Sequence, residues 1–97
     1  MEGLHQAAVT VSLKGEYDIN SRNALRRLLA SAEGADQAII DLSAVTYAGT
    51  TLINALLNLR KRMRKQGREG AIRLVGSSAN IRKVLTITRL DRVFEVA

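Results

Sequence analysis

The sequence predicts an α/β fold: a single small domain over residues 1–97, with a four- to five-stranded, mostly parallel sheet packed with three main helices. Two observations support this prediction. Apolar residues recur from end to end without an internal repeat or a linker, and their spacing changes several times between two residues and three to four residues,. Alternating strands and helices with short connections imply parallel strands joined by right-handed crossovers.

The N-terminal third predicts two strands and a helix. Ala7–Leu13 alternates apolar and polar residues, as a half-buried strand does, and Glu16–Ile19 is expected to form a short second strand after a turn,. A helix capped by Asn20 or Ser21 follows, and Gly34 suits its end,. The apolar stripe of this helix comprises Ala24, Leu25, Leu28, Leu29 and Ala32,.

The middle of the chain predicts a buried strand and a long helix. Ala38–Leu42 is a compact apolar run of the kind found in strands covered on both faces, and Ser43–Gly49 is expected to be a loop,. The helix begins at Thr50 or Thr51 and ends near Lys65. Its apolar side comprises Leu52, Ile53, Leu56, Leu57, Leu59 and Met63,.

The C-terminal third predicts a strand, a helix and an edge strand. Ala71–Val75 is the expected strand, and a third helix runs from Ser78 to about Ile87. Val93–Val96 is expected to form the last, edge strand of the sheet,. The buried side of the third helix comprises Ile81, Val84 and Leu85,.

Composition excludes several classes of site. The chain has no cysteine, so disulfides and thiolate–metal sites cannot form, and its one histidine, His5, is expected to be exposed and without a role,. No apolar run approaches the roughly 20 residues needed to cross a bilayer, and Met1–Gln6 lacks the features of a secretory signal,. We therefore expect a cytoplasmic protein that needs no metal, no cofactor and no membrane insertion.

No catalytic residues are expected either. The carboxylates of Asp18, Asp41 and Asp91 lie in separate segments, so nothing pairs them for acid–base chemistry, and the last two are expected to be structural,. No nucleophile can be combined with a base and an orienting group,. The chain is therefore not expected to be an enzyme.

Three segments resemble motifs of one known family. Asp41–Leu57 reads DLSAVTYAGTTLINALL, which resembles the signature of the STAS domain (sulfate transporter and anti-sigma factor antagonist) family. Leu13–Asp18 resembles the Gly-Glu-Leu-Asp turn of that family. Ile72–Gly76 and Val84–Phe94 resemble its closing strand, helix and Leu-Asp-x-hydrophobic-Phe ending. The resemblance covers nearly the whole chain in the expected order and implies the STAS fold.

The resemblance implies a regulatory protein-binding module: an anti-sigma factor antagonist, or a relative from stress-sensing complexes. In such antagonists a partner serine/threonine kinase, the anti-sigma factor, phosphorylates a hydroxyl at the start of the second helix. By position this acceptor is Thr50, with Thr51 the weaker candidate, and ATP would bind the partner. A phosphate adds about −1.5 to −2 charges at pH 7, enough to disrupt an interface. The docking surface is expected to comprise Tyr17, Asp18, Tyr47, Gly49, Thr50 and Asn54.

The family pattern is not followed throughout, and the site residues also have structural explanations. Gly49 stands where the family usually has Asp, and Leu52 where it usually has Gly. Thr50 could equally be a helix N-cap, and Asp18 could accept hydrogen bonds from the N–H groups of its own turn. The two tyrosines could serve in packing rather than in partner contact.

Other functions stay open at this point. Some STAS domains are soluble subunits of ABC-type membrane transport systems, and the Gly49 departure is compatible with that role. Arg60–Lys65, with Arg68 beyond, could bind nucleic acid, but at about 100° per residue the cations spread over roughly 200° of the helix, which favours a solvated face,. Three aromatic residues offer few platforms for base stacking,. A homo-oligomer is compatible with these patterns.

Overall fold

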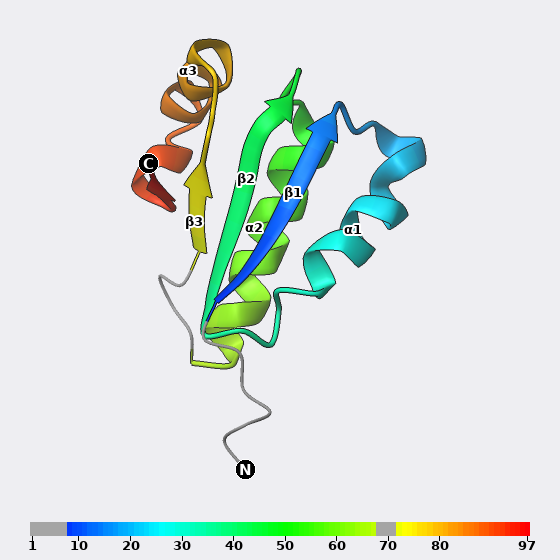
Figure 1. The fold of residues 1–97 in the computed structure, drawn as a ribbon, viewed down its shortest axis with the longest axis vertical. Helices are drawn as coiled ribbons and strands as arrows, with labels where there is room; N and C mark the ends of the chain where they lie inside the picture. Colours follow the sequence, from blue (N-terminus) through cyan, green and yellow to red (C-terminus); the bar gives the residue numbers. More distant parts are fainter. Residues whose placement is uncertain (1–7, 68–71) are drawn as a thin grey trace.

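A computed structural model describes residues 8–67 and 72–97. It confirms the predicted α/β fold, with one parallel sheet in the order β1-β2-β3-β4 and three α-helices (Figure 1). Met1–Gln6, which includes His5, lies outside the described residues, as does Arg68. The elements are β1 (Ala8–Gly15), 3-10 helix η2 (Ile19–Ser21), α1 (Arg22–Ala30), β2 (Gln37–Val45), α2 (Thr50–Lys65), β3 (Ile72–Val75), α3 (Ala79–Ile87), 3-10 helix η3 (Leu90–Arg92) and β4 (Glu95–Val96).

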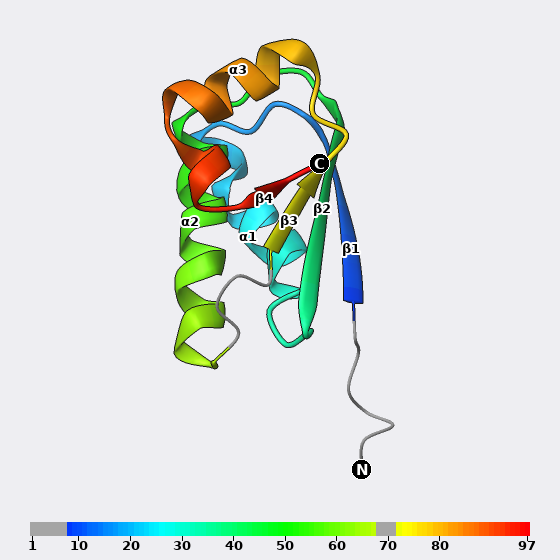
Figure 2. The ribbon, with the colours of Figure 1, turned by 90° about the vertical axis from the view of Figure 1, so that its left-hand side faces the viewer.

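Helices α1 and α2 cover the same face of the sheet (Figure 2). The strands follow one another in sequence order, and right-handed crossovers that all advance in one direction leave their helices on one side,. Side chains of β1 therefore alternate, with Val11 and Leu13 buried and Thr10 and Ser12 exposed. The prediction that Ala38–Leu42 is covered on both faces is wrong, because only alternate residues of that segment are fully buried.

The prediction of a short second strand over Glu16–Ile19 is also wrong. Glu16 and the two residues after it are irregular, and Ile19 opens the 3-10 helix η2. The reason is local: the Asp18 carboxylate accepts hydrogen bonds from the backbone N–H groups of Asn20 and Ser21, which closes a turn and prevents strand pairing,.

The strand predicted over Ala38–Leu42 is longer than expected. It continues to Val45, so the expected loop Ser43–Gly49 is shortened to its last four residues. This extension comes from the neighbouring strand: after an irregularity between Ser12 and Lys14, Gly15 of β1 still pairs with Val45. The register of β1 therefore decides where β2 ends.

Helices α1 and α2 begin close to where the sequence predicts. Helix α2 spans the predicted Thr50–Lys65, while α1 ends at Ala30, before the expected stop at Gly34. Neither Asn20 nor Ser21 caps α1 with a side-chain hydrogen bond. The core beneath and between these helices includes Val11, Leu13, Leu25, Leu29, Ile40, Leu42, Leu52, Leu56, Leu59, Met63 and Leu74.

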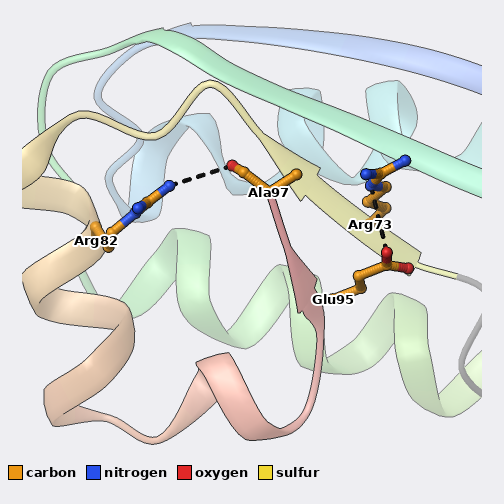
Figure 3. Close-up of polar contacts among 4 residues, drawn as sticks. All are labelled: Arg73, Arg82, Glu95 and Ala97. Atoms are coloured by element: carbon orange, nitrogen blue, oxygen red, sulfur yellow. Dashed lines mark hydrogen bonds and ion pairs between the residues drawn. The ribbon is translucent and has the colours of Figure 1, made fainter.

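The C-terminal segment closes the sheet as an edge strand. β4 pairs in parallel with β3, and the Ala97 backbone N–H donates to the Leu74 carbonyl at 2.9 Å. Two side chains hold this end: Arg82 donates to the Ala97 carbonyl at 3.3 Å, and Arg73 lies 3.6 Å from Glu95 (Figure 3). The edge strand predicted over Val93–Val96 is thus confirmed, in a shorter form.

Candidate functional site

The candidate site lies at the edge of the sheet formed by the C-terminal ends of the parallel strands β1 and β2. Helices α1 and α2 begin there, and both run back in the same direction (Figure 1). Loops that join strand ends to helix starts carry functional side chains in many α/β folds. The sequence-predicted residues, from Tyr17 to Asn54, all belong to these two connections or to the first two turns of α2.

Thr50 is the first residue of α2, and its side chain is exposed. The residue that caps the helix is Gly49, with φ −98° and ψ −173°, and its carbonyl accepts from the Ile53 N–H at 3.0 Å. The alternative prediction that Thr50 itself is the N-cap is therefore wrong. Since glycine has no side chain, the first N–H groups of α2 receive no side-chain cap,.

Asp18 has a structural role that the sequence predicts. Its carboxylate accepts from Asn20 N–H at 2.9 Å and from Ser21 N–H at 3.1 Å. The Ser21 hydroxyl oxygen in turn accepts from the Asp18 N–H at 2.9 Å, which completes a capping box at the start of η2,. The alternative that Asp18 satisfies the N–H groups of its own turn is confirmed.

The two tyrosines differ in their surroundings. Tyr17 is half-buried against the core, and its hydroxyl oxygen accepts from the Lys14 backbone N–H at 3.2 Å. Tyr47 is 59% exposed and stands beside Gly49. Packing therefore accounts for Tyr17, whereas Tyr47 is available to a partner.

A groove of about 900 Å³ lies between α1 and α2 and extends from their first residues to Leu29 and Arg62. Thr50, Thr51 and Asn54 line its α2 side, and Arg22 and Arg26 line its α1 side. No carboxylate is among the lining residues, so the groove is positively charged. The remaining lining residues are Ile19, Leu29, Ala55, Leu57, Asn58 and Arg62.

Sequence reasoning missed Arg22 and Arg26. The signal available in the sequence is their four-residue spacing, which puts two cations on one side of a helix,. That spacing alone does not distinguish a groove wall from a solvated face. Only the packing of α1 beside α2 places both arginines opposite the predicted acceptor hydroxyls.

Asp41 and Asp91 are not among the residues that line this groove. The Ser43 backbone N–H donates to Asp41 Oδ1 at 2.9 Å, and this bond together with the Ser43 hydroxyl holds the pKa of Asp41 below its usual range,. Asp91 lies in the first turn of η3. Within residues 8–67 and 72–97, no group of three His, Asp or Glu side chains could hold a metal ion.

The basic run of α2 is largely on the solvent side of that helix. Lys61, Arg64 and Lys65 are exposed, and Arg62 lies 3.1 Å from the Glu33 carboxylate. Arg64 is also engaged in an interaction within the described part of the chain. The interpretation of this run as a solvated helix face agrees with these positions.

Comparisons with known proteins place this geometry in a family. The family model for the STAS domain matches residues 2–97. None of the curated proteins matches the sequence significantly. None of the helices in the described ranges is long and apolar enough to cross a membrane.

Several solved structures share the fold. A Thermotoga maritima protein assigned as an anti-sigma factor antagonist superposes with a TM-score of 0.79 at 20% identity, covering 93% of this chain and 78% of its own. The Bacillus cell fate determinant SpoIIAA in its phosphorylated form gives 0.69 at 18% identity, with 97% and 86% covered. The STAS domain of a Vibrio cholerae SulP transporter gives 0.67 at 19% identity, with 93% and 72% covered.

Proposed function

The chain belongs to the STAS domain family, and from this membership we propose that it is a cytoplasmic regulatory module of the anti-sigma factor antagonist type. It binds a partner serine/threonine kinase and catalyses nothing itself. Phosphorylation of Thr50 by that kinase ends the association. ATP binds the kinase, so this chain needs no cofactor.

The observation that carries the proposal is the position of Thr50. An exposed hydroxyl at the first residue of a 16-residue helix is open to a kinase active site. The uncapped N–H groups and the positive end of the helix dipole favour an anion there,. Thr51 is the next residue, but it is only partly exposed, which makes it the weaker acceptor.

The proposed docking surface is the groove rim together with the exposed loop before α2. Tyr47 offers a large exposed ring, and Asn54 is exposed one turn beyond Thr50 on the same side of the helix,. Asp18 and Tyr17 support this surface by fixing the loop between β1 and η2. A phosphoryl group at Thr50 would stand in the middle of this surface and change both its shape and its charge.

The proposal is tested by phosphorylation of the purified chain. A tagged chain is used to recover its partner from cells, the complex is incubated with ATP, and intact mass is measured. One added phosphate is expected on the unaltered chain and on Thr51→Ala, and none on Thr50→Ala. A phosphate that survives Thr50→Ala would exclude Thr50 as the acceptor.

The same recovery step separates the second candidate function. If the chain is instead a subunit of an ABC-type transport system, a transporter ATPase is recovered and ATP adds no phosphate to this chain. The observation behind this alternative is that residue 49 is a glycine, which leaves no carboxylate before Thr50.

A further inference from the structure

Two arginines of α1 carry charge that the described part of the fold does not compensate. Arg22 and Arg26 are one helical turn apart, so they project from the same side of α1, and both line the groove,. Both are exposed, and neither forms an ion pair or a hydrogen bond with a side chain within residues 8–67 and 72–97. The third arginine of the groove, Arg62, is already paired with Glu33.

The pair between Arg62 and Glu33 joins the C-terminal half of α2 to the turn that follows α1. Both helices run in the same direction from the same edge of the sheet. At that edge, Arg22 is the first residue of α1 and Thr50 is the first residue of α2, and both line the groove. Arg22 therefore lies across the groove from the start of α2.

We propose that Arg22 and Arg26 form an anion-binding subsite that receives the phosphoryl group of phosphorylated Thr50. This inference rests on the proposed function and adds to it the place where the phosphoryl group is held. The phosphoryl group bends across the groove from α2 toward α1 and is bound there, rather than extending into solvent.

The chemistry of the groove suits a phosphate monoester. A phosphothreonine presents three acceptor oxygens, and guanidinium groups bind two such oxygens at once in a planar fork. The N–H groups at the start of α2 face the same oxygens and have no side-chain cap to displace,. Two arginine charges match the dianion, so phosphorylation converts a positive groove into a neutral one.

The test places phosphoserine at position 50 by genetic code expansion, so that no kinase is required. Phosphorus NMR then follows the second ionisation of the phosphate. Two cations that bind the dianion are expected to lower this phosphate pKa by about half a unit to one unit relative to an Arg22→Gln/Arg26→Gln double variant. Raising the salt concentration on the unaltered groove should remove the difference, because exposed charges are screened.

Arg27→Gln is the matched control. Arg27 follows Arg26 on α1 and is also exposed, but it does not line the groove, so its replacement should leave the phosphate pKa unchanged. Equal pKa values in all three proteins, or an equal change in the control and the double variant, would overturn the subsite. A kinase that leaves Thr50 unmodified would instead refute the proposed switch, and the NMR result would stand independently of it.

Discussion

The ring of Tyr47 covers Gly49 so closely that a Cβ atom built on Gly49 would come within 2.7 Å of the ring carbon Cε2. The backbone of Gly49 is extended, so its dihedral angles do not require glycine,. The constraint at this position is therefore the tyrosine ring, which is exposed and can turn away. A carboxylate-bearing residue at position 49 would therefore require the Tyr47 ring to move.

We expect Gly49→Asp to stabilise the domain and to displace Tyr47. Aspartate is among the best N-cap residues, and its charge interacts favourably with the start of α2, so the free energy of unfolding should rise by about 0.5–1 kcal/mol. Urea unfolding followed by circular dichroism measures this change. Chemical shifts of the Tyr47 ring protons report whether the ring has moved.

Gly49→Ala is the control for that substitution. It adds the same Cβ atom without a capping group, and alanine is a poorer N-cap than glycine, so the stability should fall by about 0.5 kcal/mol. If both variants shifted stability in the same direction, the Cβ contact with Tyr47 would dominate and the capping explanation would be wrong.

Gly76 should be the least replaceable of the glycines with positive φ. Its φ is +72°, and an added Cβ would lie 2.9 Å from Asp41 Oδ1 and 3.2 Å from the Ser43 backbone nitrogen. Gly15 has a similar φ of +68° with nothing within 4 Å. Both changes to alanine cost about 1–2 kcal/mol of backbone strain, and Gly76→Ala should cost at least about 1 kcal/mol more. Equal losses in thermal or urea unfolding would show that the turn relaxes freely.

Asp18→Ala should weaken the loop that leads into α1. The substitution removes an acceptor shared by two backbone N–H groups, and loss of such a cap costs about 1 kcal/mol,. Asp18→Asn keeps an acceptor oxygen and should restore most of the stability. If Asn and Ala variants were equally unstable, the charge of Asp18, rather than its capping geometry, would be what the fold needs.

Long, strongly periodic segments made the fold predictable. The apolar side of Thr50–Lys65 repeats over about three turns, and Leu52, Leu56, Leu59 and Met63 are buried as expected,. The failures are short segments. Tyr17 and Ile19 alternate like a strand, but the Asp18 side chain competes successfully for the local N–H groups,.

The site was harder to predict than the fold, because its charge depends on packing between elements. The position of α2 decides whether Arg22 faces solvent or a groove. The residues of α2 that line the groove lie far from Arg22 in the sequence. Thr50 could be named from the sequence as a candidate acceptor, because family motifs mark it along the chain. No family motif identifies Arg22 or Arg26, which line the other side of the groove.

Asp41 should make the domain less stable in acid. Hydrogen bonds from the Ser43 backbone N–H and hydroxyl lower the pKa of Asp41 in the folded state, so between this folded pKa and the unfolded pKa of about 4 the unfolded state binds more protons than the folded state,. The stability that Asp41 contributes is therefore complete above its unfolded pKa and is lost as the pH falls through the lower, folded pKa. Between about pH 6 and pH 2, the free energy of unfolding should fall less steeply in Asp41→Asn than in the unaltered chain. Ser43→Ala keeps the backbone bond, which is the larger cause, and should give an intermediate slope; parallel curves for all three proteins would contradict the assignment.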